Sequence, residues 1–103
     1  MVFRIDLADA ARKEFAALDR DWQKRLGGFL DDLLTLPDPS VRFEHLHNKL
    51  AGLWKHREGH VRMIVHIDKG CIRVLVLKIG RRDEVYAINK KELKRFAQEI
   101  ENP

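Results

Sequence analysis

The chain has 103 residues, a length typical of one domain with a hydrophobic core of ordinary size, and we assign residues 1–103 to a single domain. One cysteine excludes an internal disulfide and favours the reducing cytoplasm, and no stretch is long and apolar enough for a signal peptide or a membrane span. Lysine and arginine number 20 against 16 acidic residues, so the net charge of +4 permits a polyanionic partner without requiring one.

The first predicted elements are a strand and a helix. Residues 2–6 alternate between apolar and polar side chains, as a half-buried strand does. Asp6 is then a candidate N-cap, and apolar residues at helical spacing continue to Leu18. We therefore expect a strand that leads directly into a first helix.

A second helix follows, and two prolines end it. Asp19 or Asp21 can cap its first turn, and a broad apolar stripe continues to Leu36. The pair Gly27-Gly28 costs about 1 kcal/mol per glycine relative to alanine, which predicts a compensating close approach to the first helix. The two helices are therefore expected to form a hairpin.

Two tight β-hairpins follow an irregular connection. Residues 41–51 show no clear periodicity, so we expect no regular element there. Glu58-Gly59 and Lys69-Gly70 can each form a two-residue loop, because glycine accepts the positive φ that such turns require. With the N-terminal strand, the three strands around these loops make a mainly antiparallel four-stranded sheet.

These turns predict a register and two faces for the sheet. The predicted pairs are Arg57–His60, Lys55–Arg62, Asp68–Cys71, His66–Arg73, Met63–Val76 and Arg62–Leu77. A core face then collects Trp54, Val61, Met63, Val65, Ile67, Ile72, Val74 and Val76, with His56 on the same side. A basic face carries Lys55, Arg57, His60, Arg62, His66 and Arg73 among Leu53, Ile64, Leu75 and Leu77.

Asn89 followed by Glu92 is typical of a capping box, and an amphipathic last helix follows it to the C-terminus. The predicted fold class is therefore α+β. A single domain packs an N-terminal strand and a two-helix hairpin on one face of the four-stranded sheet, and a C-terminal helix completes it. Two helices suffice to cover one face, so we expect the basic face to be open.

The basic face is suited to an anion. Cations opposed across a ladder cost stability, and a phosphate would remove that cost, because arginine binds its oxygens bidentately while lysine supplies a point charge. The alternative is that these residues are solvated surface cations without a further role.

Other chemistries lack the residues they require. The five histidines have no cluster of carboxylates or cysteines beside them, so we expect neither a metal nor another cofactor. Ser40 and Thr35 are the only serine and threonine, and Cys71 is more typical of a small, partly buried hydrophobe than of a nucleophile. Catalysis in which the substrate brings its own nucleophile remains. An RNA 2′-hydroxyl needs only a base, an acid for the leaving oxygen, and cations on the phosphorane.

The segments LAGLWKHREGHVRMIVHIDKG and KIGRRDEVY, residues 50–70 and 78–86, resemble the RelE branch of the RelE/ParE toxin superfamily. The similarity lies in the combination of Leu-x-Gly-Leu-Trp-Lys, Gly-x-x-Arg, and Gly-x-Arg followed by Glu-Val-Tyr. The order of elements agrees with that family over nearly the whole chain. The resemblance implies the toxin of a type II toxin–antitoxin system.

Such a toxin is a metal-independent endoribonuclease, a ribosome-dependent mRNA interferase that cleaves mRNA in the A site by attack of a 2′-hydroxyl. The resemblance implies a cytoplasmic protein whose partners are a RelB-like antitoxin, the ribosome and mRNA. It assigns Lys55 as general base, Arg62 to the transition state, Arg82 to the leaving group and Tyr86 to the nucleotide. We add a substrate-binding set from the basic segment: Lys49, Arg57, His60, His66, Arg73 and Arg81.

The chain departs from the archetype at Leu53, where the archetype has a second lysine. His60, His66, or the pair Glu44 and His45 are therefore alternative residues for acid–base work. Two other functions stay open on the same fold. One is a ParE-like inhibitor of DNA gyrase, and the other is a non-catalytic nucleic-acid-binding relative.

Overall fold

The computed structural model describes residues 3–68, 70 and 73–101, so the predictions made for Lys69, Cys71 and Ile72 lie outside the described residues. Its α-helices are α1 (Asp9–Ala16), α2 (Arg20–Leu33) and α3 (Lys90–Glu101). Its strands are β1 (Arg4–Leu7), β2 (Glu44–His45), β3 (Trp54–Glu58), β4 (Val61–Asp68) and β5 (Arg73–Arg81). Two short 3₁₀ turns, Pro39–Arg42 and Asn48–Leu50, flank β2.

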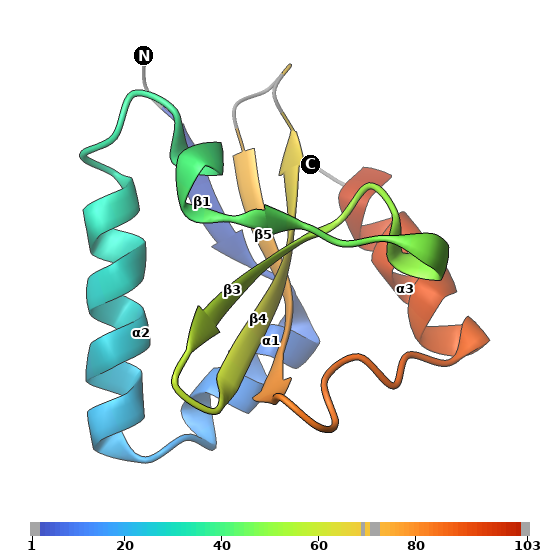
Figure 1. The fold of residues 1–103 in the computed structure, drawn as a ribbon, viewed down its shortest axis with the longest axis horizontal. Helices are drawn as coiled ribbons and strands as arrows, with labels where there is room; N and C mark the ends of the chain where they lie inside the picture. The colour runs from blue at the N-terminus through green and yellow to red at the C-terminus, as the bar shows by residue number, and fades with distance from the viewer. Residues whose placement is uncertain (1–2, 69, 71–72, 102–103) are drawn as a thin grey trace.

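The predicted α+β class is confirmed, with one strand more than expected. The sheet has five strands in the order β1-β5-β4-β3-β2, in which β1 runs parallel to β5 and the other neighbours are antiparallel. The added strand is β2, which lies where we expected an irregular connection. Figure 1 shows α2 and α3 on opposite sides of this sheet, so both of its faces carry a helix.

The prediction that Asp6 caps the first helix is wrong. Asp6 lies inside β1, and its Oδ2 accepts a hydrogen bond from Nε of Arg73 at 2.8 Å, while Ala8 occupies the N-cap position of α1. The strand continues past Asp6 because its parallel partner β5 pairs as far as Leu7. Ala8 then donates its N–H to the carbonyl of Val76, which sets the point where the chain turns into α1.

The second helix begins after Asp19, as predicted, but its two glycines serve no close approach. A Cβ added at Gly27 or Gly28 would meet no atom within 4 Å. α2 instead packs against the sheet through Leu26, Phe29 and Leu33, which are buried. The buried stripe of α2 does not include Gly27 or Gly28, so the predicted close approach of the first helix at these two glycines is wrong.

The first hairpin turns one residue later than predicted. Gly59 and His60 form the loop, and φ of Gly59 is +58°, which places the glycine first in the turn. The observed pairs are therefore Arg57–Arg62 and Lys55–Ile64, not Arg57–His60 and Lys55–Arg62. Each β4 partner is displaced by two residues, so alternation keeps the predicted faces.

The second hairpin contains a β-bulge that the sequence did not predict. Asp68 pairs with Arg73 and His66 with Leu75, again two residues beyond the predicted partners. The ladder is interrupted between Ile64 and Val65, after which Ile64 pairs with Lys78, Met63 with Ile79 and Arg62 with Gly80. The shift of three residues reverses the faces of β5 beyond the bulge, so Lys78 shares a face with Arg62.

The face that we expected to be open is partly covered. Ile64, Leu75 and Leu77 on it are fully or almost fully buried. Phe96 of α3 is buried as well, and Nζ of Lys78 forms an ion pair with Glu92 of α3 at 2.9 Å. α3 therefore lies over the apolar part of the basic face, while Arg57 near the β3–β4 turn remains exposed.

None of the described helices is long and apolar enough to cross a membrane.

Candidate active site

A group of polar side chains gathers on the accessible end of the sheet. We call it the Tyr86 cluster, and its members come from four segments of the chain: Glu44, Lys55, Arg57, Arg62 and Tyr86. The register places Glu44 opposite Lys55 and Arg57 opposite Arg62, so these four side chains share one face. Tyr86 reaches the same face from the segment that follows β5.

Lys55 lies between Tyr86 and Glu44 in the cluster. Its Nζ lies 5.9 Å from the centroid of the Tyr86 ring, within the range of a cation–π contact. On its other side Lys55 pairs with Glu44 across β2 and β3, where opposite charges favour the sheet. An ammonium group, a carboxylate and a phenol therefore lie together, which is a set able to move protons.

Arg62 is a buried cation with fixed partners. Its exposed fraction is 9 %, and Nη1 donates to the carbonyl of Gly59 at 2.6 Å and to that of Val61 at 3.1 Å. A guanidinium group removed from water needs such acceptors. The tight β3–β4 turn supplies them, and this arrangement holds the charge at the Tyr86 cluster.

Tyr86 brings a phenol into this positive environment. Burial raises its pKa above the ordinary value of 10.0, while the charges of Arg62 and Arg57 act in the opposite direction. Its hydroxyl oxygen is buried and makes no hydrogen bond within the described residues. The charge of Arg62 and its side-chain contact with the hydroxyl both lower the pKa of the phenol, although this contact does not have the geometry of a full hydrogen bond.

Arg82 lies next to the same turn. Its backbone N–H donates to the carbonyl of His60 at 2.9 Å, one residue from the Gly59 carbonyl that Arg62 binds. Its side chain is exposed. The turn therefore brings the backbone of Arg82 close to the guanidinium of Arg62, although the two residues are 20 positions apart in sequence.

The histidines divide between the two faces, and the expectation that His60 lies on the basic face is wrong. Its ring packs edge-on against Trp22 of α2 at 4.8 Å, because His60 is a turn residue rather than part of a strand. His45 lies 3.7 Å from Trp54, on the side of the sheet opposite Glu44. His66 does lie on the basic face, where burial lowers its pKa, but it is four residues along β4 from Arg62.

The remaining predicted substrate-binding residues are dispersed. Arg57 is exposed at the cluster. Arg73 is ion-paired to Asp6, and Arg81 pairs with Val61 at the end of β5, on the core face. Lys49 binds a backbone carbonyl, that of Ile88. Of the predicted substrate-binding set, the structure thus brings only Arg57 to the Tyr86 cluster.

Glu44 is the site residue that sequence patterns identify least well. The sequence predicts no regular element around Glu44, because a two-residue strand is too short to show alternation. Its place opposite Lys55 follows from pairing with β3, which no local pattern predicts. Within residues 3–68, 70 and 73–101, no three His, Cys, Asp or Glu side chains are grouped so that they could hold a metal ion.

The fold and the cluster together define a class of protein. It is a small α+β domain in which a five-stranded sheet carries a cluster of cations, a carboxylate and a phenol at one accessible end. No protein-family model matches the chain, and no curated protein matches it.

Solved structures, in contrast, match over most of the chain. A chain in the crystal structure of the RelBE2 toxin–antitoxin complex from Mycobacterium tuberculosis has a TM-score of 0.70 at 23 % identity, covering 80 % of this chain and 100 % of that one. The isolated RelE toxin of E. coli has a TM-score of 0.62 at 18 % identity, covering 97 % and 99 %. The archaeal RelE–RelB complex from Pyrococcus horikoshii gives 0.64 at 23 %, covering 82 % and 100 %. The chain therefore has the fold of these RelE toxins.

Proposed function

We propose that this chain is the toxin of a type II toxin–antitoxin system and acts as a ribosome-dependent mRNA interferase that cleaves mRNA in the A site. The observation that carries the proposal is the meeting of Lys55, Arg62 and Tyr86 on one face of a RelE-type fold. The family resemblance assigned roles to these residues, and the sheet brings them together from three separate segments.

The proposed reaction needs no nucleophile from the protein. The 2′-oxygen of the RNA forms a bond to the adjacent phosphorus, and the bond from phosphorus to the 5′-oxygen of the next nucleotide breaks. A base accepts the proton of the 2′-hydroxyl, and an acid donates one to the departing 5′-oxygen. The products are a 2′,3′-cyclic phosphate and a 5′-hydroxyl. Cations stabilise the additional negative charge on the phosphorane between these steps.

The roles follow from the chemistry of each group. Arg62 presents a fixed charge to the phosphorane, since its turn contacts hold it in place. Arg82, beside the same turn and exposed, stabilises the leaving oxygen. Tyr86 orients the nucleotide through its ring, which lies beside Lys55.

Glu44 as a carboxylate, or Lys55 as a free amine, accepts the proton of the 2′-hydroxyl. The resemblance assigns this role to Lys55, and the cross-strand pair adds Glu44 as a second candidate. This chain has Leu53 where the archetype has a second lysine, so a carboxylate is suited to act as the base instead. We expect both Glu44→Gln and Lys55→Met to lower the cleavage rate. The variant with the larger loss identifies the residue that acts as the base.

We further propose a RelB-like antitoxin as the neutralising partner of a cytoplasmic toxin. The RelE structures from M. tuberculosis and P. horikoshii were solved as complexes with their antitoxins. An antitoxin that covers the basic face, or displaces α3 from it, would block access of mRNA and the ribosome to the Tyr86 cluster.

The test is cleavage of a translated mRNA, mapped by primer extension, with purified protein and ribosomes. We expect cuts within the A-site codon for the native chain and a loss of about a hundred-fold or more for Arg82→Ala. Arg20→Ala is the matched control, because Arg20 is an exposed arginine of α2 away from the cluster. An Arg82→Ala protein that cleaves like the native chain would remove the proposed role of this residue.

A gyrase supercoiling assay, run beside the cleavage assay, separates this function from its alternatives. A ParE-like toxin would inhibit supercoiling and leave mRNA intact. A non-catalytic relative would bind RNA without cutting it, and its toxicity would survive replacement of Arg62 or Arg82. Either result would contradict the proposed nuclease.

A further inference from the structure

The segment that carries Tyr86 is held between two buried side chains, Val85 and Ile88. At its start Val85 is buried against Gly80, and the N–H of Val85 donates to the carbonyl of Arg81 at 2.8 Å. The Tyr86 hydroxyl adds no hydrogen bond within the described residues. Besides its contacts with Arg62 and Lys55, the orientation of the ring therefore also depends on how the backbone is held on its other side, at Ile88.

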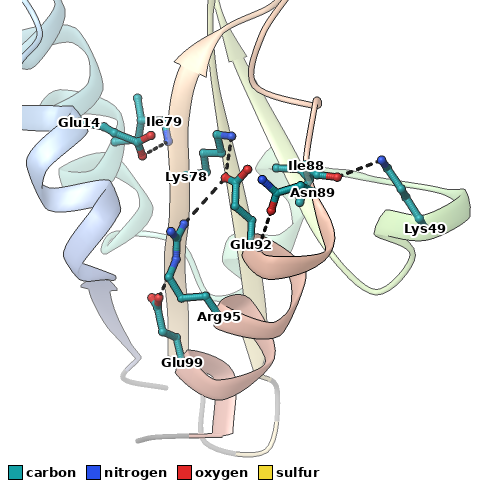
Figure 2. A network of polar contacts seen from close by, with 9 residues as sticks. All are labelled: Glu14, Lys49, Lys78, Ile79, Ile88, Asn89, Glu92, Arg95 and Glu99. Carbon is teal, nitrogen blue, oxygen red and sulfur yellow. Dashed lines mark hydrogen bonds and ion pairs between the residues drawn. The ribbon is translucent and has the colours of Figure 1, made fainter.

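Lys49 supplies an attachment on that side. Its Nζ donates to the carbonyl of Ile88 at 3.0 Å, across 39 residues of sequence (Figure 2). The N–H of Ile88 in turn donates to the carbonyl of Tyr86 at 2.9 Å, which closes a three-residue turn. Ile88, whose carbonyl binds Lys49, is thus hydrogen-bonded directly to Tyr86.

Lys49 lies in the 3₁₀ turn Asn48–Leu50, which has a defined local structure. Asn48 before it has a φ of +57°, a left-handed conformation, and Leu50 after it is buried. The N–H of Leu53 donates to the carbonyl of Leu50 at 3.1 Å, so the 3₁₀ turn leads directly into β3 and Lys55. Lys49 therefore connects the strand that carries Lys55 with the segment that carries Tyr86.

We propose that Lys49 is a positioning residue, which fixes the Tyr86 ring over Lys55 by holding the carbonyl of Ile88. The inference builds on the proposed function and revises the substrate-binding role that the sequence suggested for Lys49. A lysine whose ammonium group binds a backbone carbonyl orients the segment before any substrate arrives. A phosphate-binding lysine would instead act only when RNA is present.

Tyr86 is the only tyrosine in the chain, so the NMR signal of a labelled tyrosine ring reports on it alone. We expect Lys49→Met to shift and narrow this signal in the free protein, because the segment gains mobility. Lys49→Arg, which keeps a charged donor, restores the native signal. Lys24→Met, a change to an exposed lysine of α2, leaves it unchanged. Lys49→Gln repeats the measurement with a neutral side chain if the Met variant does not fold.

Cleavage kinetics give the second readout. Lys49→Met should lower kcat about ten-fold with little change in KM, as a misplaced catalytic group does. An increase in KM alone, with an unmoved tyrosine signal, would assign Lys49 to phosphate binding and overturn the proposal. A Lys49→Arg signal like that of Lys49→Met would also overturn it. The NMR experiment uses no RNA, so it decides the role of Lys49 even if the native chain proves not to cleave mRNA.

Discussion

The phenol of Tyr86 is buried beside two guanidinium groups, so its ionisation reports on the charges of the whole cluster. Burial raises its pKa above 10.0, and Arg62 opposes this effect more than Arg57 does. We expect Arg62→Met to raise the pKa of the phenol further and Arg57→Met to raise it less. Absorbance of the tyrosinate during alkaline titration measures this for the single tyrosine. A lower pKa in the Arg62→Met protein would show that the guanidinium does not act on the phenol.

Sequence alone could identify some of these residues but not their neighbours. Lys55 and Arg62 could be assigned to one face because alternation along a strand has a period of two. The face of His60 could not, since it depends on which residues form the turn. The partners of Lys49 and Glu44 lie in segments far away along the chain, and no local pattern indicates them.

At the level of the elements, the β3–β4 turn depends on one glycine. Gly59 has a φ of +58°, and a Cβ added there would lie 2.8 Å from the Trp22 ring. We expect Gly59→Ala to destabilise the fold by about 1–3 kcal/mol, through backbone strain and the clash with Trp22. Gly28→Ala is the matched control. It lies in a helix with open space around it and should stabilise by up to about 1 kcal/mol. Urea unfolding measures both, and equal effects of one sign would contradict this account.

The elements show where sequence reasoning about the sheet succeeds. The strands β3, β4 and β5 and the cap of α3 were predictable, and the N–H of Glu92 does donate to Asn89 Oδ1 at 2.8 Å. The bulge between Ile64 and Val65 was not, because an extra residue in β5 leaves no mark on its apolar pattern. That bulge turns Lys78 toward α3, so the sequence could not indicate how the last helix attaches.

Across the whole molecule, polar side chains connect the sheet to its covering helices. The Lys78–Glu92 pair holds α3 on the basic face, and Arg95 extends it to Glu99 along the helix (Figure 2). On α1, the carboxylate of Glu14 accepts the N–H of Ile79 at 3.0 Å, beyond the point where β1 has ended. Polar side chains thus complete the sheet where a strand partner is missing, and stability should depend on their protonation.

The contribution of His56 to the pH dependence of stability can be measured separately with a single substitution. Its ring is stacked on Phe29 of α2 at 3.5 Å, and burial lowers its pKa below the ordinary value of 6.5, although a hydrogen bond with Glu58 opposes the shift. The folded state therefore binds this proton less readily than the unfolded state. The stabilisation that the neutral ring contributes is complete above the unfolded pKa and is lost as the pH falls through the lower, folded pKa.

We expect the free energy of unfolding to fall between about pH 7.5 and about pH 5.5, and to fall less in His56→Phe, which keeps the aromatic stack. Urea unfolding of both proteins at both pH values measures the difference, and an equal fall in the two would exclude His56 as its source.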